Sequence, residues 1–330
     1  EELDAFYRAC TGDGDSRPPE LAVQYGDFAL WQRQTFANEA VCANQIKFWR
    51  TQLSGTLPVI ELPADRLRPA RQSFHGSNVF FNIPTALARD LKCLGEREGC
   101  TFFMTVLASF QALLQRYSGA EDIVIGTPVS ARTPREVEPL IGNFLNMAAL
   151  RCDLSGDPTF LEVLRRTRDT TLNAFSNGDL PFEVMLEHLK FERDPSRNPI
   201  FQVLLQVLSN TAPRMGDLEI TGFHFDLNFA QFDLSLHLYE ETGGYLGRFE
   251  YCADLFEPQT IRRLCGNYRT LLEAIVCHPD QSISRLPMLT DVERQQLLME
   301  WNNTGPAPAT KDLCLHHLIE EQTGRTPDQV

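Results

Sequence analysis

The residues between 200 and 251 constrain the fold of this chain most, because they contain several patterns that are typical of β-strands. The segment 200–208, which follows Pro199, is almost continuously apolar, as is typical of a strand covered on both faces. Two further runs alternate apolar with polar residues, as strands with one buried face do: Phe223, Phe225, Leu227 and Phe229, then Phe232, Leu234, Leu236 and Leu238. A turn at 240–244 joins the second run to 245–251, which predicts an antiparallel hairpin.

Segments with the apolar spacing of α-helices precede and follow these predicted strands in the sequence. Thr101 is a suitable N-cap, and apolar residues recur at helical spacing from there to Ser118. Residues 158–177 and the segment after Pro258 show the same spacing, whereas 122–126 is a short apolar strand. The order of these elements predicts an α/β fold in which a mixed β-sheet packs with helices. Residues 55–78 hold several Pro and Gly and no clear period, so we expect an extended connector there.

The net charge and the spacing of the cysteines argue against several classes of protein. The chain has 44 acidic and 30 basic residues and a formal net charge of −14, which argues against a nucleic-acid partner. No apolar run approaches the roughly 20 residues that span a bilayer, so we expect no membrane partner, and no secretory signal is visible. Nine irregularly spaced cysteines predict buried free thiols in a reducing compartment, and hence a cytoplasmic protein.

Common catalytic motifs do not occur in the sequence. It contains no G-x-S-x-G, no G-x-x-x-x-G-K and no G-x-G-x-x-G. His316 and His317 are adjacent on a predicted helix and point about 100° apart, so they are predicted to lie on a solvated helix start rather than to share a metal. Asp233, Ser235 and His237 share one face of a strand, but their spacing of about 7 Å is too wide for a relay, and a polar strand face is the simpler interpretation.

Four polar or Gly-containing segments do not look like ordinary turns. They are Tyr25-Gly-Asp-Phe-Ala-Leu-Trp31, Ile141-Gly-Asn-Phe-Leu-Asn146 ahead of Arg151, Asn177-Gly-Asp-Leu-Pro-Phe-Glu183, and Arg193-Asp-Pro-Ser-Arg-Asn-Pro199. Taken singly, each has a structural interpretation: Asp179 and Glu183 can cap a helix, and Arg193, Asp194 and Arg197 can form a local ion-pair cluster. Loops carry both caps and functional sites, so this alternative stays open at the level of the single segment.

In this order, the four segments resemble the later core motifs of nonribosomal peptide synthetase condensation domains. The family patterns are Y-x-D-F-A-x-W, I-G-x-F-V-N-T followed by Arg, H-Q-D-x-P-F-E and R-D-x-S-R-N-P-L. The chain departs from them at Asn177-Gly178, in place of His-Gln, and at Met147, in place of Thr. The resemblance covers residues 1 to about 288, and from Leu315 onward the chain resembles the start of an adenylation domain.

The resemblance implies a C-terminal lobe. The family's catalytic motif, H-H-x-x-x-D-G, is expected shortly before Tyr25 and does not occur in these 330 residues. Similarity to the family therefore implies the C-terminal lobe of a two-lobed fold related to chloramphenicol acetyltransferase. We expect residues 1–83 to be the lobe junction and connector, 84–288 the C-terminal lobe, 289–314 a linker and 315–330 the adenylation start.

The resemblance also implies a reaction and partners. In the intact enzyme, condensation domains form an amide between a donor acyl or peptidyl thioester and an acceptor aminoacyl thioester. The expected partners are the N-terminal lobe, upstream and downstream carrier proteins and the downstream adenylation domain. No cofactor is expected to bind directly, since the phosphopantetheine arms of the carrier proteins tether the substrates. By this interpretation the lobe is inactive alone and holds no catalytic residue and no metal.

The predicted site residues follow from the motifs. Those expected at the tunnel or in a structural role are Asn146, Arg151, Asp179, Phe182, Arg193, Asp194, Arg197, Asn198 and Asp233. Among them, Asn146, Arg151 and Asn198 are expected to point toward the tunnel between the lobes, and Arg151 to pair with the Asp of the upstream motif. The region 223–251 is expected to reach onto the other lobe, and to be mobile or paired with a neighbouring molecule without it.

Two other functions stay open at this level. One is a self-sufficient acyltransferase of the same superfamily, with His237 as its base. The other is a non-catalytic module that docks carrier proteins.

Overall fold

The computed structural model describes residues 2–11, 20–132, 134–189, 194–209, 218, 220, 227–303 and 314–326. Arg193 and residues 223–226, which carry two of the expectations above, lie outside this part of the chain. The chain divides into two compact units, Glu1–Met288 and Leu289–Val330.

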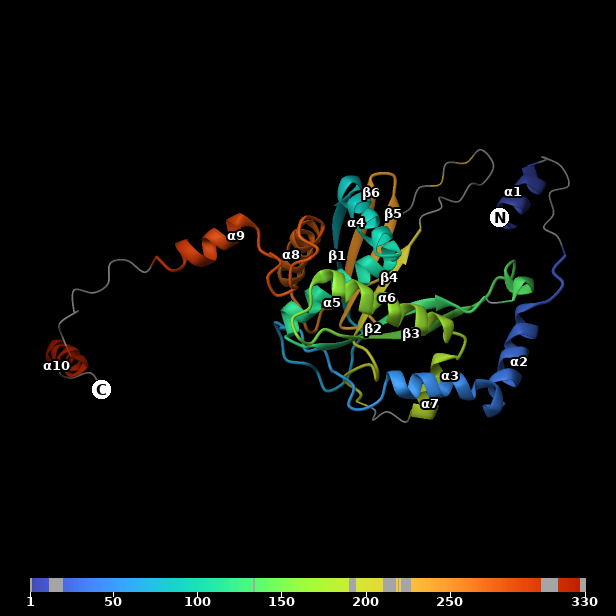
Figure 1. Cartoon of the computed structure of the whole chain (residues 1–330), viewed down its shortest axis with the longest axis horizontal. Coiled ribbons are helices and arrows are strands. Elements are labelled where there is room, and N and C mark those ends of the chain that lie inside the picture. The colour runs from blue at the N-terminus through green and yellow to red at the C-terminus, as the bar shows by residue number, and fades with distance from the viewer. Residues whose placement is uncertain are drawn as a thin grey trace. The chain divides into compact units, whose positions relative to one another are not determined.

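A six-stranded mixed sheet forms the centre of the first unit (Figure 1). Its strands are β1 (Gly76–Pro84), β2 (Asp122–Ser130), β3 (Leu145–Asp153), β4 (Val203–Leu208), β5 (Leu234–Glu241) and β6 (Gly244–Cys252). They are ordered β1-β6-β5-β4-β2-β3; β4 runs parallel to both of its neighbours and the other pairs are antiparallel. The predicted α/β fold with a mixed sheet is confirmed, as is the hairpin at 240–244.

Four helices cover one face of this sheet. They are α4 (Thr85–Arg97), α5 (Phe102–Ser118), α6 (Phe160–Ser176) and α8 (Pro258–Cys277). The fully buried ring of Tyr268 in α8 lies 6.2 Å from that of Phe110 in α5 and 6.1 Å from that of Phe249 in β6. Aromatic rings at these separations attract one another beyond the burial of their area, so they fix the helices against the sheet.

Local signals set the ends of these helices. Thr101 caps α5, and its hydroxyl accepts a hydrogen bond from the backbone N of Met104 at 3.3 Å. Gly119 ends α5 with a φ of 71°, a conformation that glycine adopts without a steric penalty. Thr159 and Glu162 form a reciprocal capping box at the start of α6. The helices predicted at 101–118, at 158–177 and after Pro258 are thus confirmed to within a few residues.

Smaller helices lie beside the β2–β3 hairpin and its loop (Figure 1). Two of them, α2 (Tyr25–Phe36) and α3 (Glu39–Gln52), are consecutive, and α2 packs near the hairpin loop that contains the short helix η1 (Arg135–Val137) (Figure 1). Helix α7 (Phe182–Leu189) contacts both α3 and β3, and α1 (Glu2–Thr11) precedes them all. This end of the unit carries the first three motif segments.

The expectation that 223–251 reaches onto another lobe is wrong for the described residues of the hairpin. β5 and β6 are central strands: β5 pairs with β4 and β6, and β6 pairs with β5 and β1. Their backbone groups therefore have partners within the chain. Only the end of the first alternating run, from Leu227, is described, and there Phe229 forms an isolated bridge with His75.

The second unit contains α9 (Asp291–Gln295), η2 (Gln296–Glu300) and α10 (Leu315–Arg325). None of the described helices is both long and apolar enough to cross a membrane. All nine cysteines are free, but Cys10, Cys93, Cys277 and Cys314 are exposed, which corrects the expectation that all are buried.

Candidate functional site

The first two motif segments meet in a small core of their own. Phe28 of α2 packs against Phe144 with ring centroids 4.6 Å apart, and Val137 and Leu140 complete the buried cluster. The ring of Tyr25 lies flat on Gly142, where a Cβ would come within 2.1 Å of a ring carbon, and its hydroxyl donates to the carbonyl of Asn143 at 3.0 Å. Glycine at 142 is therefore required for α2 to approach this loop.

Arg132 closes the loop of the β2–β3 hairpin. Its Nη1 donates to the carbonyls of Val137, Glu138 and Leu140 at 2.8, 3.0 and 2.7 Å. Its guanidinium also lies 4.1 Å from the centre of the Phe144 ring, so a cation–π contact adds to the hydrogen bonds. The loop is thus held in one shape under α2.

Asn146 joins the second motif segment to the third. Its side chain is 9% exposed, and its Nδ2 donates to the carbonyls of Gly178 and Leu180 at 2.8 and 2.7 Å. Its Oδ1 accepts from the backbone N of Phe182 at 2.9 Å. The three bonds enclose Asp179, and Trp49 of α3 adds a fourth by donating from Nε1 to the carbonyl of Asn177 at 3.0 Å. The loop that carries Asp179 is therefore fixed from two sides.

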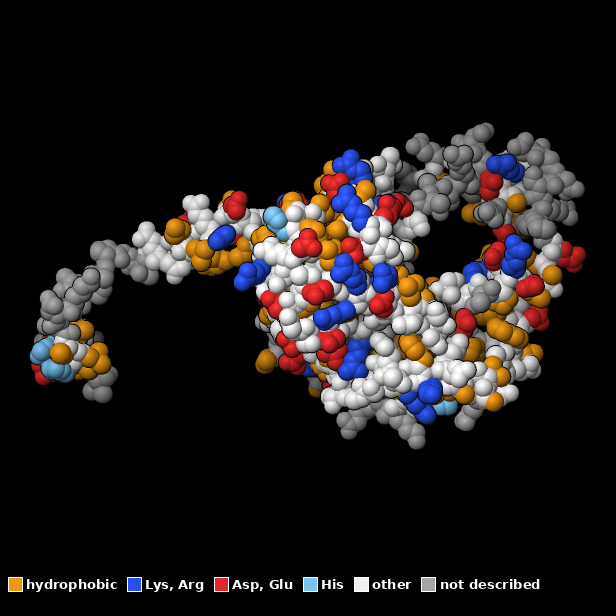
Figure 2. All heavy atoms as spheres, viewed as in Figure 1, with side chains coloured by type: hydrophobic (Ala, Val, Ile, Leu, Met, Phe, Trp, Pro, Cys, Tyr) orange, Lys and Arg blue, Asp and Glu red, His pale blue; other side chains and the backbone are white. Residues whose placement is uncertain are grey.

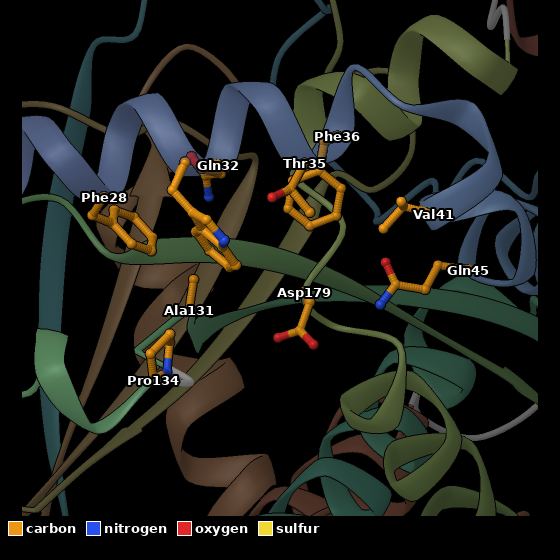
Figure 3. Close-up of a pocket in the computed structure, with 10 residues that line it drawn as sticks. Phe28, Gln32, Thr35, Phe36, Val41, Gln45, Ala131, Pro134 and Asp179 are labelled. Atoms are coloured by element: carbon orange, nitrogen blue, oxygen red, sulfur yellow. The ribbon is translucent and has the colours of Figure 1, made fainter.

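A cavity of about 390 Å³ opens where these segments meet (Figure 3). Its lining comes from α2, α3, the β2–β3 loop and the third motif segment: Phe28, Trp31, Gln32, Thr35, Phe36, Val41, Gln45, Ala131, Pro134 and Asp179. Asp179 and Gln45 both line this cavity, and both side chains lie below Phe36 in the view of Figure 3. The volume lies within the range of small-molecule sites, about 300–1,000 Å³.

The fourth segment lies elsewhere and fastens the connector to the sheet. Asp194 accepts from the backbone N and the hydroxyl of Ser196 at 2.8 and 2.7 Å, and these bonds lower the pKa of its carboxyl. Arg197 lies 3.0 Å from Glu61 of the connector and 3.8 Å from Asp194. Asn198 donates to the carbonyl of Gln231 at 2.8 Å, ahead of β5. This segment therefore has a structural role, because it joins the connector to the residues that precede β5.

Arg68, also in the connector, adds a further attachment between the connector and the sheet. Its guanidinium makes a two-pronged contact with Asp233, in which Nη1 is 3.0 Å from Oδ1, and Nη1 also donates to the carbonyl of Ser196 at 3.2 Å. The Asp233 side chain is 7% exposed. The hydrogen bond to Asp233 raises the pKa of Arg68, so the pair is held ionised.

Asn146, Arg151 and Asn198 are not brought together. Successive residues of a strand point to opposite faces, so Asn146 and Arg151 lie on opposite faces of β3. Arg151 binds Asp122, with Nε 3.0 Å from Oδ1 and Nη2 2.7 Å from Oδ2, and also donates to the carbonyl of Ser54 at 2.7 Å. Within this chain its carboxylate partner is thus Asp122.

His237 lies in the centre of the sheet on the face away from α5 and α8. Its Nδ1 is 3.2 Å from Oε1 of Gln206 on β4, and Nε2 is buried without a hydrogen-bond partner among the described residues. Burial, with a smaller contribution from Arg248, lowers the pKa of His237 to about 3. The imidazole is neutral near pH 7 and a weak base. Asp233 is bound by Arg68 instead, so the two do not form a relay.

The depressed pKa of His237 predicts a loss of stability in mild acid. Between pH ~6.5, where an unfolded histidine titrates, and pH about 3, the unfolded chain binds a proton that the folded chain does not. Stability from this residue is therefore complete above pH ~6.5 and falls by about 1.4 kcal/mol per pH unit below it, or about 2 kcal/mol at pH 5. Urea unfolding at several pH values measures this slope. His237→Leu should make the slope shallower by one proton, whereas equal slopes in the wild type and His237→Leu would contradict the assignment.

Some residues of the site carried no signal in the sequence. Phe182 was expected, and its ring lies 5.7 Å from that of Phe201. Arg68 and Trp49 were not, because each acts through a partner that is distant in the sequence. Arg132 was not either, although the carbonyls that it binds lie only 5 to 8 residues away. The spacing of Tyr25, Phe28 and Trp31 by three residues along one helix is the one signal that could have indicated the aromatic wall of the cavity.

Known proteins resemble this chain over its whole length. The family model described as "Condensation domain" matches residues 1–298. One of the proteins that make up the linear gramicidin synthase of Brevibacillus parabrevis is 40% identical over 333 residues, which cover 100% of this chain but only 6% of that protein. The structure of the X-domain from teicoplanin biosynthesis is 31% identical with a TM-score of 0.76, covering 87% of this chain and 69% of that one.

A third comparison supports the fold alone. A four-domain nonribosomal peptide synthetase, solved with AMP and glycine bound, has a TM-score of 0.79 at 22% identity, covering 99% of this chain and 26% of that chain. The family model covers most of the chain, and the relative that is 40% identical matches all of it. The chain belongs to the condensation-domain family of nonribosomal peptide synthetases.

Proposed function

We propose that this chain is the C-terminal lobe of a condensation domain, followed by the start of an adenylation domain. The observation that carries the proposal is the meeting of three motif segments around Asn146, in the order in which the family has them. The full-length match with the linear gramicidin synthase protein, which continues beyond residue 298 where the family model ends, supports the assignment of 315–330. The boundary between compact units at Met288 and Leu289 supports a linker from 289.

In the intact enzyme the proposed reaction is amide formation between two tethered thioesters. The acceptor amine attacks the donor carbonyl, a C–N bond forms, the C–S bond breaks, and the amine proton passes to the departing thiolate. Since thioesters are already activated, catalysis consists mainly of alignment, which can supply about 7–11 kcal/mol, and of one proton transfer, worth about 10²–10⁴-fold. This lobe would supply one wall of the tunnel between the lobes, and the N-terminal lobe the histidine.

The partners follow from the same proposal. Upstream and downstream carrier proteins would bring the two thioesters on phosphopantetheine arms, and the N-terminal lobe and the adenylation domain would flank this lobe. The alternative base, His237, is disfavoured because an imidazole with a pKa of about 3 takes up a proton poorly at neutral pH. The proposal therefore assigns the proton transfer to the N-terminal lobe.

One assay tests the proposal. The chain alone, and the same chain extended by the residues that precede it in the natural protein, are each mixed with donor-loaded and acceptor-loaded carrier proteins, and peptidyl product is followed by mass spectrometry. Product from the extended protein only, unchanged by His237→Ala, is expected. Product from the chain alone that disappears in His237→Ala would support the self-sufficient acyltransferase. Carrier binding without turnover in the extended protein would support a docking module.

A further inference from the structure

A hollow between α3 and α7 lies outside the four motif segments. It has a volume of about 480 Å³, and the described residues that line it are Ala43, Ile46, Lys47, Arg50, Thr51, Ser54 and His188. Those from α3 and the residues just after it follow one another at intervals of three or four, so they share one side of the helix. His188 lies in the last turn of α7. We call this feature the α3–α7 hollow.

The α3–α7 hollow is basic, although the protein has a net charge of −14. Lys47, Arg50 and His188 all line it, and none of its described lining residues is Asp or Glu. Within the described part of the chain, none of these three side chains forms an ion pair or a hydrogen bond. Figure 2 shows Lys or Arg side chains beside a histidine at the α7 end of the unit. A concave surface with charges of one sign attracts ions of the other sign.

The lining also indicates what kind of anion fits. An ammonium, a guanidinium and an imidazole together offer N–H donors from several directions, which suits the several oxygens of a phosphate group better than the two of a carboxylate. Ile46 is 8% exposed and gives the hollow an apolar part. None of its described lining residues is Phe, Tyr or Trp, so it offers a nucleotide base little to stack on. An aliphatic group fits better beside the phosphate.

The two sides of the α3–α7 hollow are held in place before any ligand arrives. Arg151 fixes the end of α3, since its Nη1 donates to the carbonyls of Gln52 and Ser54 at 3.3 and 2.7 Å. Trp49 fixes α3 to the segment that precedes α7 by donating from Nε1 to the carbonyl of Asn177 at 3.0 Å. Binding therefore does not have to order the backbone of α3, which lowers its entropic cost.

We propose that the α3–α7 hollow binds a phosphate ester carried on a short aliphatic stem. The phosphate lies among Lys47, Arg50 and His188, and the stem packs on Ile46. This binding site goes beyond amide formation, because the described residues of this chain line it on both sides and no motif segment contributes to it. Only the source of the ester rests on the proposed function, in which the phosphopantetheine arm of a carrier protein is such a molecule.

Matched probes test the chemistry. Phosphopantetheine and pantetheine share the aliphatic stem and differ in the phosphate. Each is titrated into the 330-residue chain while the backbone amide signals of α3 and α7 are followed by NMR. Phosphopantetheine should bind about tenfold more tightly than pantetheine, and its advantage should shrink with added salt. Equal binding of the two would overturn the proposal. AMP carries the phosphate on a nucleoside and should bind less tightly than phosphopantetheine, and tighter binding of AMP would rule out the aliphatic stem.

A set of variants tests the residues. Lys47→Gln and Arg50→Gln each remove one positive charge from the α3–α7 hollow, and each should weaken phosphopantetheine about threefold to tenfold with no effect on pantetheine. Arg33→Gln, at an exposed arginine of α2 that does not line the hollow, should change neither. Equal unfolding midpoints show that the variants are folded. An equal loss in Arg33→Gln would mean that the net charge, not the hollow, attracts the phosphate.

The source of the ester is tested with a carrier protein, with and without its phosphopantetheine arm. Both forms are titrated into the chain extended by the residues that precede it naturally. Only the form with the arm should shift the signals of α3 and α7, and Lys47→Gln should reduce these shifts. No shift from that form would refute the arm as the ligand, and equal shifts from both forms would mean that the carrier surface occupies the hollow. These titrations involve no turnover, so the peptidyl-product assay tests amide formation separately.

Discussion

Replacing Arg68 by Met should lower the free energy of unfolding of the first unit by about 3 kcal/mol. Arg68 neutralises Asp233, which is 7% exposed, and also binds the carbonyl of Ser196. Without the guanidinium, a buried carboxylate stays behind with no compensating charge, which costs far more than an exposed ion pair gives. The change is measured as a lower midpoint of urea unfolding, followed by the fluorescence of the buried Trp49.

Arg66 provides the control for this prediction. It lies two residues away, pairs with Glu257 at 3.6 Å, and both side chains are more than half exposed. Arg66→Met should therefore cost less than about 1 kcal/mol. Adding Asp233→Leu to Arg68→Met should restore part of the loss, since it removes the unpaired charge. Similar losses from Arg68→Met and Arg66→Met would show that the contact with Asp233 does not hold the connector to the sheet.

The regular elements of the core were predictable because their signals are local. The helices α5, α6 and α8 each repeat apolar residues at helical spacing, and Thr101 and Gly119 mark the ends of α5. The alternation in 234–251 indicated the β5–β6 hairpin, because Leu234, Leu236 and Leu238 share one face of β5, although the polar residues between them are buried as well. In these segments local pattern and tertiary packing agree.

Two strands were missed for different physical reasons. β1 is an edge strand whose burial does not alternate regularly, and its first residues lie in what was predicted as connector. β3 carries two predicted site residues, Asn146 and Arg151, and polar residues on both faces conceal the strand period. β1 pairs with β6, far along the chain, so its structure depends on contacts that no local window contains, whereas β3 pairs with the preceding strand β2.

The difference between local patterns and long-range contacts also decides how much of the site could be predicted from the sequence. The order of the motif segments indicated the family, but not which segments meet in space. Asn146, expected to point toward a tunnel, makes three bonds to the third segment. Its partners lie 32 to 36 residues away and two of them are carbonyl oxygens, which every residue has, so the sequence holds no record of the pairing.

Replacing Asn146 by Leu should be as damaging as the loss of Arg68 and should also loosen the loop that carries Asp179. The buried carbonyls of Gly178 and Leu180 and the N–H of Phe182 would lose their partner, at about 1 kcal/mol or more each, so about 3 kcal/mol in total. Asn173→Leu, on the exposed side of α6, should cost little, because its side chain is exposed. Urea midpoints of the two variants measure the difference.

An NMR comparison then separates a positioning role of Asn146 from a general contribution to stability. Under conditions where Asn146→Leu is still folded, the variant loses the three bonds that hold residues 178–182. The backbone amide signals of these residues should shift, whereas those of α5, which Asn146 does not contact, should stay where they are in the wild type. Unshifted signals of 178–182 in folded Asn146→Leu would mean that Trp49, through its bond to the carbonyl of Asn177, and the helix α7 alone position this loop.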